Sequence, residues 1–278
     1  MRPEISQTAA LGTLTLVGLY VGCVLMGWAI DSLHPVNDRD DTEVDPDAHK
    51  KTTMRPRDQN NVFDLVQALH DPSKQVVLYT VRRLMDLSAF KSFQTQIGAY
   101  GGIEALVNLL LVDRTSMDDE TNALTIAIFL TLSNLTVHAT NHNVMHAANL
   151  ERVVADIYDE PSLPMAVKLP CLRLMTNLAM WSESSTWLLD APVVHTLAAD
   201  LLSSASDDWT NGILQLFANL TDPASMSSAG DRAAIDSIVD ATVCFCELEG
   251  EHITPRQREN AQCILRNASQ AVLSRPVM

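Results

Sequence analysis

The sequence predicts an all-α protein built as a stack of helical repeats, an α-solenoid. A short apolar motif with a polar residue in third place recurs along the chain, and the polar residues are Asp86, Asn134, Asn177, Asn219 and a weaker Asn267. Their successive separations are 48, 43, 42 and 48 residues. Apolar residues keep a helical phase throughout, without the alternation that strands require. A period in the forties with helical texture is typical of stacked two- and three-helix repeats.

Helix-breaking residues divide the chain after position 59 into at least four repeat units. Glycine and proline pairs interrupt the apolar pattern at positions 71–72, 101–102, 161–164, 191–192, 222–223 and 254–255. Between them we expect ten or eleven helices, with longer ones near 119–138, 164–180, 207–221, 229–248 and 255–273. The expected fold is therefore a right-handed superhelix that occupies residues 59–278.

Composition excludes several classes of function. The chain has 278 residues, 47% of them hydrophobic, and a formal net charge of -15. This charge disfavours nucleic acid as a partner, because such binders depend on clustered Lys and Arg. Five cysteines without a spaced framework indicate reduced, packed thiols. Because no phosphate-binding, metalloprotease or nucleophile motif is present, we expect no enzyme activity, no cofactor and no metal.

Residues 11–30 predict one membrane-spanning helix after a short flank of residues 1–10. The twenty residues LGTLTLVGLYVGCVLMGWAI carry no charge and as a helix would cross about 30 Å of hydrocarbon. A signal peptide is the competing interpretation, but this apolar run is long for one and lacks a small-residue cleavage site. Gly18 and Gly22 form a small-xxx-small pair that would let two membrane helices approach closely.

Residues 31–58 predict an acidic, flexible tether between the membrane helix and the repeats. This stretch contains three prolines, eight acidic and five basic side chains and few large apolar ones. Such a composition cannot bury enough surface to offset chain entropy. Basic residues that follow the span weakly favour a cytosolic repeat domain.

The repeats resemble those of armadillo proteins. AYGGIEALVNLLL, followed by a helix ending in LTLSNL, has the glycine turn, second helix and longer third helix of that repeat, and the scheme recurs to about residue 222. The anchor, the tether and the phrases SNLTVHATNHNVMH and LRLMTNLAMWSESSTWLLDAPV resemble the membrane-anchored Alex-type group of armadillo repeat-containing proteins. This resemblance implies an anchor in the outer mitochondrial membrane, a cytosolic repeat domain and a role in mitochondrial distribution and dynamics. That group carries a basic flank where this one is acid-rich, so the endoplasmic reticulum stays open as the alternative membrane.

The repeated asparagines allow two interpretations. Similar asparagines of peptide-binding armadillo proteins pair with the backbone of an extended peptide, which would make Asn134, Asn177, Asn219 and Asn267 a binding ladder. The alternative is that their amides tie adjacent repeats together. One turn earlier stand Leu130, Arg173, Gln215 and Cys263. Because none of these is Trp, the groove lacks the slots by which nuclear-import proteins hold lysine.

Two other groups of side chains stand out near the ladder. Arg173 and Trp181 flank Asn177 by one turn each and could anchor a partner, although Trp181 could equally belong to the core. His138, His142 and His146 have helical spacing. We expect the helix to end near His138 and Asn141 to cap the next helix, which disfavours a zinc site.

Two functions fit these features. The first is a membrane-anchored adaptor or scaffold that recruits a protein or an extended peptide into its groove at an organelle surface. The second is a constitutive structural subunit of a large membrane assembly, braced by the solenoid.

Overall fold

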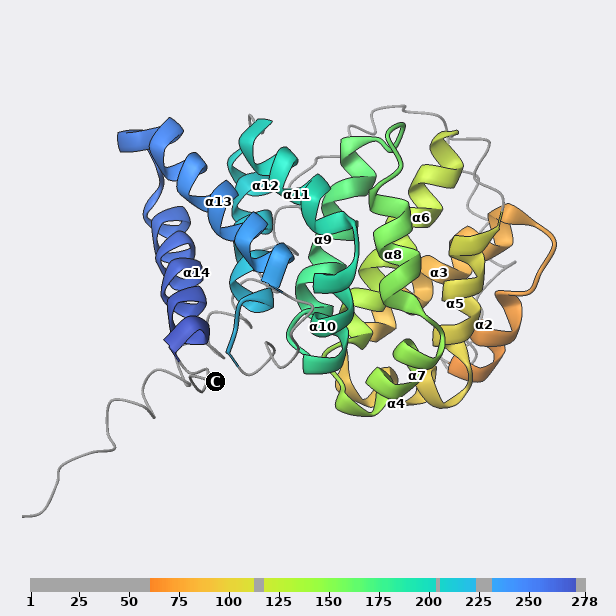
Figure 1. Cartoon of the computed structure of the whole chain (residues 1–278). Helices are drawn as coiled ribbons and strands as arrows, with labels where there is room; N and C mark the ends of the chain where they lie inside the picture. Colours follow the sequence, from red (N-terminus) through yellow and green to blue (C-terminus); the bar gives the residue numbers. More distant parts are fainter. Residues whose placement is uncertain (1–60, 113–117, 204–205, 224–231, 274–278) are drawn as a thin grey trace, which may run out of the picture. The chain divides into compact units, whose positions relative to one another are not determined.

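The structure is a computed structural model that describes residues 61–112, 118–203, 206–223 and 232–273 (Figure 1). The chain divides into two compact units, Met1–Arg55 and Pro56–Met278, and the described residues all belong to the second. The expected membrane helix, with Gly18 and Gly22, and the expected tether up to residue 58 lie outside the described residues. The described part is entirely helical and contains no strand, as the sequence predicts.

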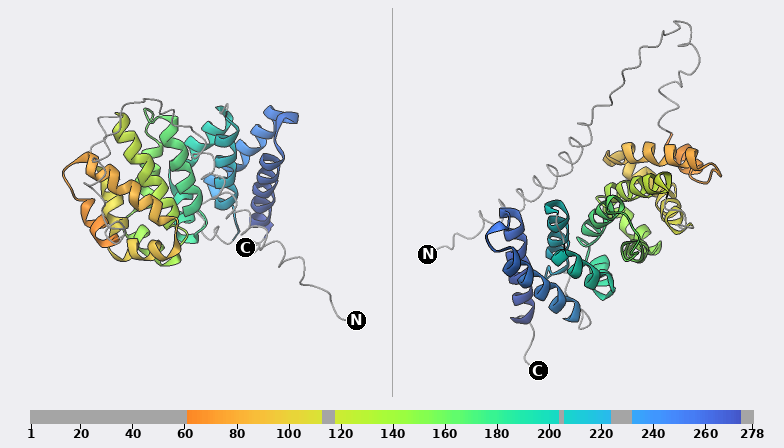
Figure 2. Two further views of the ribbon diagram at one scale, coloured as in Figure 1. Left: turned by 180° about the vertical axis from the view of Figure 1, so that it is seen from behind. Right: turned by 90° about the horizontal axis from the view of Figure 1, so that it is seen from above.

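Thirteen α-helices and two short 3-10 helices make up the described residues. In chain order they are α2 (Val62–Ala68), α3 (Lys74–Ser88), α4 (Lys91–Ala99), α5 (Gly102–Leu111), α6 (Asp119–Leu135), η2 (Ala139–Asn141), α7 (His142–Ala147), α8 (Leu150–Tyr158), α9 (Met165–Leu178), α10 (Ser182–Asp190), α11 (Val193–Ser203), α12 (Asp207–Leu220), α13 (Arg232–Glu249), η3 (Gly250–His252) and α14 (Pro255–Leu273). The long helices α3, α6, α9, α12 and α14 pack consecutively, each against the next (Figure 2). They are the third helices of successive repeats.

A single hydrophobic cluster runs through all the described repeats, from Val62 to Ala268. The third helices α3, α6, α9 and α12 contribute leucines that are buried, such as Leu135, Leu178 and Leu220. Burying one leucine side chain stabilises the fold by roughly 1.5 to 3 kcal/mol. These leucines directly follow the ladder asparagines in sequence, so core packing fixes where the asparagine side chains stand.

The turns that begin α5 and α8 explain two of the repeat's small or polar residues. Gly101 has φ 80° and Asn149 has φ 55°, and both are the N-cap residues of a second helix. Glycine adopts this left-handed backbone at no steric cost, and Asn tolerates it better than most residues. A Cβ at Gly102 would lie 2.8 Å from the carbonyl oxygen of Ile97. Only glycine therefore fits where α4 turns into α5.

The long helices match the expected ranges closely, but the expected number of ten or eleven helices is wrong. The extra helices are short, such as α2 with seven residues and α7 with six. Isolated helices shorter than about 12 to 15 residues are marginal in water, so packing against neighbours decides whether they form. Periodicity over so few residues could not separate them from turns.

No single described helix is long and apolar enough to cross a membrane. Two consecutive helical segments, Asp119–Leu135 and Ala139–Ala147, have enough length and apolar composition to span a membrane only when they are taken together, and the chain bends by 118° between them.

Candidate functional site

The ladder asparagines of α9 and α12 tie consecutive third helices together. The Asn177 Nδ2 atom donates a hydrogen bond to the Ser133 carbonyl oxygen at 3.1 Å, and Asn219 Nδ2 donates to the Thr176 carbonyl oxygen at 2.9 Å. Each acceptor is the residue just before the asparagine of the preceding repeat. Because a backbone carbonyl can only accept, and only the NH2 group of a carboxamide can donate, these bonds also fix which way each carboxamide points.

Asn134 makes the equivalent link through a serine hydroxyl. Its Nδ2 atom donates to Ser88 Oγ at 3.0 Å, and Ser88 Oγ donates to the Met85 carbonyl oxygen at 2.7 Å. Met85 precedes Asp86, which holds the ladder position of α3. The register of the ladder is therefore kept, with the Ser88 hydroxyl inserted between amide and carbonyl.

Asn267 behaves differently. Its Nδ2 atom lies 3.6 Å from the Cys263 sulfur, one turn back on the same helix α14. Among the described residues it makes no bond to α12. The last asparagine thus belongs to the sequence pattern but not to the set of inter-repeat ties.

The carboxamide oxygens are less occupied than the nitrogens. Asn219 Oδ1 accepts from Gln215 Nε2 at 3.3 Å. Within the described residues, Asn134 Oδ1 and Asn177 Oδ1 have no hydrogen-bond donor, and neither atom is fully buried. Each of these two side chains therefore presents an oriented acceptor to the surroundings.

We define the ladder face as the ladder positions and the positions one turn before them. Its ten residues are Asp86, Asn134, Asn177, Asn219, Asn267, Arg82, Leu130, Arg173, Gln215 and Cys263. All are half-buried except Arg82 and Asp86, which are exposed. Asp86 forms an ion pair of 3.6 Å with Arg83. In the described part of the chain, neither Arg82 nor Arg173 forms an ion pair.

Trp181 is half-buried and packs against His142, with ring centroids 3.3 Å apart. His142 Nε2 donates to the Thr136 carbonyl oxygen at 2.7 Å. Burial lowers the pKa of His142, the bond to Thr136 opposes this shift, and nearby His138 adds to it. The structure places Trp181 between the two proposed roles, because part of its surface supports the turn after α6 and part stays accessible.

The three histidines have separate partners. His138 Nε2 lies 3.1 Å from the Thr95 hydroxyl, and His146 Nδ1 lies 3.3 Å from a Glu151 carboxylate oxygen. No group of histidine, cysteine and carboxylate side chains in the described ranges could hold a metal ion.

Asn141 has a role that the sequence did not reveal. It is the N-cap residue of α7, as expected, but its side chain makes no cap bond to that helix. Instead Nδ2 donates to the carbonyl oxygens of Leu135 at 3.0 Å and Gln94 at 3.3 Å. Asn141 is 2% exposed, so it joins the end of α6 to α4 from inside the fold.

Two polar contacts of buried residues also join repeats, and the sequence did not predict them. Glu151, 2% exposed, accepts a hydrogen bond of 2.6 Å from the Ser184 hydroxyl. The Tyr158 hydroxyl donates to Asp200 at 2.8 Å. Burial and then this contact raise the pKa of Tyr158. In both pairs the partners lie more than thirty positions apart in sequence, and no local pattern marks them.

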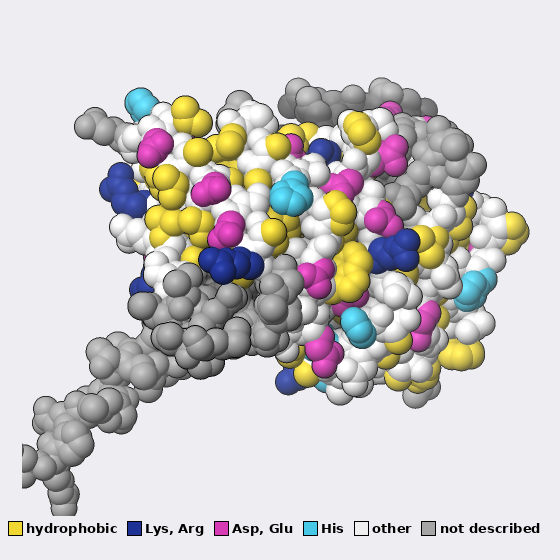
Figure 3. Space-filling view, viewed as in Figure 1, with side chains coloured by type: hydrophobic (Ala, Val, Ile, Leu, Met, Phe, Trp, Pro, Cys, Tyr) yellow, Lys and Arg dark blue, Asp and Glu magenta, His cyan; other side chains and the backbone are white. Residues whose placement is uncertain are grey.

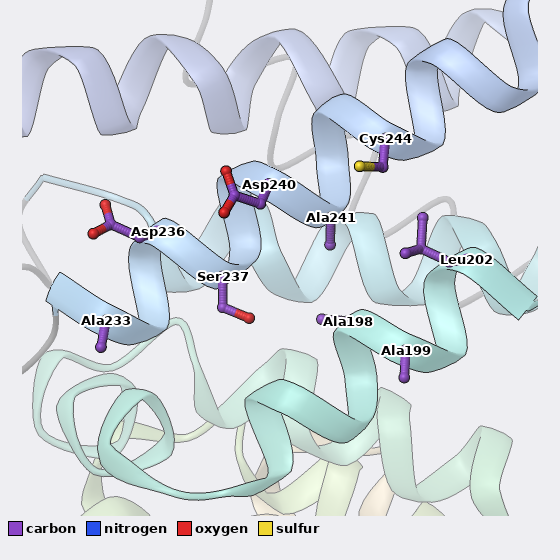
Figure 4. A pocket seen from close by; sticks show the side chains of 9 residues that line it. All are labelled: Ala198, Ala199, Leu202, Ala233, Asp236, Ser237, Asp240, Ala241 and Cys244. Atoms are coloured by element: carbon purple, nitrogen blue, oxygen red, sulfur yellow. The ribbon is translucent and has the colours of Figure 1, made fainter.

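A shallow hollow of about 560 Å³ lies between α11 and α13 (Figure 4). Its lining consists of small side chains with two carboxylates, and the residues are Ala198, Ala199, Leu202, Ala233, Asp236, Ser237, Asp240, Ala241 and Cys244. Hydrophobic and acidic side chains lie together over α13 and its neighbours (Figure 3). The lining offers no converging set of nucleophile, base and donor groups.

Comparison with known proteins supports the fold. No family model matches the chain, and no curated protein is similar enough in sequence to match. Among solved structures, an engineered protein aligns with a TM-score of 0.56 at 21% identity over 76% of this chain and 98% of its own. A designed armadillo repeat protein, solved in complex with the peptide (KR)4, aligns with a TM-score of 0.60 at 18% identity over 74% and 81%. Designed armadillo repeat proteins for modular peptide recognition align with a TM-score of 0.59 at 19% identity over 74% and 81%.

The chain therefore has an armadillo-like repeat fold. In the described residues, consecutive third helices from α3 to α14 form four packed pairs, and these pairs correspond to the four intervals between the ladder positions in the sequence.

Proposed function

We propose that this protein is a membrane-anchored armadillo adaptor or scaffold that recruits a protein partner through an extended segment bound on the ladder face. The observation that carries the proposal is the state of the carboxamides of Asn134 and Asn177. Their nitrogens are used within the fold, while their oxygens are oriented and have no donor among the described residues. An extended partner supplies backbone N–H groups that suit such acceptors, whatever its side chains are.

Solved armadillo-like structures give this proposal a precedent. One similar designed protein was solved with the peptide (KR)4 bound, and others were designed for modular peptide recognition. Third helices that pack consecutively present their ladder positions at a spacing of about 8 to 10 Å. An extended chain covers that distance with about three residues. A bound segment could therefore meet successive asparagines at a regular interval.

The proposed membrane anchor and subcellular location are supported by the sequence alone. The uncharged residues 11–30 support a single-pass anchor, and the resemblance to the Alex-type group supports the outer mitochondrial membrane with the repeats in the cytosol. The adaptor would then act in the distribution or dynamics of that organelle. The alternative, a permanent subunit of a membrane assembly, differs in that its surface stays covered.

Site-specific photocrosslinking in cells tests the proposed function. A photoreactive residue replaces Leu130 or Gln215 on the ladder face, and Arg152 on α8 serves as the outer control position. We expect adducts with the same partner from both ladder positions and none from Arg152. The partner should dissociate from the uncrosslinked protein on dilution, whereas a stoichiometric complex that resists dilution would favour the structural subunit. Adducts from the control alone would contradict binding on the ladder face.

Fractionation tests the membrane part separately. We expect the full chain to stay in the membrane pellet after carbonate extraction, and external protease to remove the repeat domain from intact mitochondria. A protein that is protected until the outer membrane is opened would overturn the proposed orientation.

A further inference from the structure

The ladder face has an unusual charge for this protein. The whole chain carries a formal net charge of -15, yet the ladder face contains Arg82 and Arg173 and a single acid, Asp86. Asp86 is already paired with Arg83. The local balance on the ladder face is therefore positive on an acidic molecule.

From this charge pattern we propose that the segment bound on the ladder face is acidic and carries carboxylates that pair with Arg82 and Arg173. The proposal rests on the proposed function and names the chemistry of its partner. Both arginines lie one turn before a ladder position, and neither pairs with an acid in the described ranges. Arg173 also lies one helical turn before Asn177 on α9, so one short stretch of partner could donate an N–H to Asn177 and offer a carboxylate to Arg173.

The spacing of the two arginines sets a rule for the partner. Arg82 lies on α3 and Arg173 lies on α9, and α6 packs against both of these helices. Two helix-to-helix steps of about 8 to 10 Å correspond to about five or six residues of extended chain. The bound segment should therefore carry acidic residues at about that interval, with polar or apolar residues opposite the uncharged Leu130 between them.

The acidity of the molecule as a whole does not cancel this preference. At physiological salt the screening length is about 8 Å, so carboxylates on distant helices act weakly on a bound segment. Charge-assisted hydrogen bonds at contact distance are strong by comparison. Local pairing therefore decides the sign of the partner, while the distant acids only slow its approach.

Arg82 and Arg173 should also prevent the ladder face from binding basic peptides. A basic segment would bring its lysines toward Arg82 and Arg173, and it would find no unpaired acid at the described ladder positions. Like charges placed together disfavour the wrong partner and so give specificity. The designed neighbour that was solved with (KR)4 thus shares the fold and not the expected choice of peptide.

Fluorescence anisotropy with the full chain in mild detergent tests the inference. The probes are rhodamine-labelled peptides of about twelve residues, long enough to span both arginines. They alternate threonine with aspartate, asparagine or lysine. The test variant carries Arg82→Gln and Arg173→Gln. The matched control carries Arg152→Gln and Arg232→Gln, which removes the same total charge from two exposed arginines on α8 and α13.

We expect the aspartate peptide to bind best and the lysine peptide worst. The test variant should bind the aspartate peptide about ten- to a hundredfold more weakly, at three- to tenfold for each arginine, and bind the asparagine peptide unchanged. The control variant should bind all three peptides like the wild type. Its thermal midpoint and that of the test variant verify that both are folded.

The outcomes separate this inference from the proposed function. If all three peptides bind equally and Asn177→Ala with Asn219→Ala weakens them all, the ladder grips a backbone and the acidic preference is wrong. If the control variant loses as much affinity as the test variant, general charge holds the peptide and the inference is also wrong. If no peptide binds at about 1 mM, corresponding to about -4 kcal/mol, both proposals fall.

Discussion

The ladder asparagines of the central repeats make different contacts from the ladder asparagine of the C-terminal helices α13 and α14. On α9 and α12 the amide crosses to a backbone carbonyl of the preceding third helix, and on α6 it crosses through Ser88. On α14 it turns back to Cys263 of its own helix. The motif thus predicts where a third helix ends, while the neighbouring helix decides whether the amide becomes a tie.

The two regions also differ in their first helices. In the central repeats the short helices α4, α7 and α10 precede the second helix, whereas the described residues before α13 contain no such short helix. Asn141, at the start of α7, and Trp181, at the start of α10, make contacts that have no counterpart beside α13 in the described part. In the central repeats, the C-terminal end of α6 is therefore held by the Asn141 side chain as well as by the ladder asparagine Asn177.

Removing two central ties should have the largest effect on stability. Asn219→Ala takes its donor from the Thr176 carbonyl oxygen, and Asn177→Ala leaves the Ser133 carbonyl oxygen with the Thr136 hydroxyl as its remaining donor. A stranded polar group costs about 1 to 3 kcal/mol and a lost hydrogen bond about 0.5 to 1.5 kcal/mol, so the pair should cost about 1.5 to 4.5 kcal/mol. Thermal denaturation followed by circular dichroism should show a lower midpoint. An unchanged midpoint with weaker peptide binding would mean that these amides serve the partner alone.

Gly98→Ala tests the buried hydrogen bonds of Asn141, which join α4 to the end of α6. A Cβ at Gly98 would collide with Asn141 Oδ1, whose side chain is held by two carbonyls. Alanine in a helix gains about 1 kcal/mol over glycine, but overpacking costs about 1 to 3 kcal/mol, so we expect a net loss. Gly212→Ala is the matched control, because its Cβ would meet the apolar Leu172 side chain at Cδ2 and Cγ and no hydrogen-bonded group. Equal effects of both changes would show that Asn141 can move aside.

Ser88→Ala tests the relayed tie between α3 and α6. The change removes the hydroxyl that accepts from Asn134 and donates to Met85. We expect a loss of about 1 to 2 kcal/mol in the free energy of unfolding, measured by urea denaturation. Ser92→Ala, on the exposed surface of α4, should change it little. If the two variants unfold alike, Asn134 has found another acceptor.

Sequence reasoning recovered the features that repeat and missed those that are local to one junction. The period from Asp86 to Asn267 gave the repeat number and the long helices, because apolar phase and breakers recur with it. The direction of the Asn177 carboxamide could not be predicted, since it depends on a carbonyl forty-four positions away. Asn141 looked like a cap because its location between two helices fits one equally well. The buried Glu151 gave no signal at all, since nothing local to it names Ser184.

The burial of His142 beside Trp181 should also make the stability of the fold depend on pH. Burial lowers the pKa of His142 in the folded state, so the unfolded chain binds this proton more tightly. Stability from this group is then complete above pH 6.5 and declines as the pH falls below that value. His142→Gln should reduce the drop in thermal midpoint between pH 7.5 and 5.5. His195→Gln, which is exposed on α11, is the control. A drop that stays the same in His142→Gln would assign the pH dependence to other groups.

Asn267→Ala should have the smallest effect and sharpens the comparison most directly. Asn267 has the same place in its motif as Asn177, so a role fixed by sequence alone would give both substitutions similar costs. Its amide reaches only the Cys263 sulfur at 3.6 Å, and sulfur is a weak acceptor. Alanine also has a better helix propensity than asparagine by a fraction of a kcal/mol. We therefore expect a change within about 0.5 kcal/mol by urea denaturation, the usual range for surface substitutions. A loss of 1 kcal/mol or more would show that α14 does make a tie to α12, and that the last repeat obeys the same rule as the central ones.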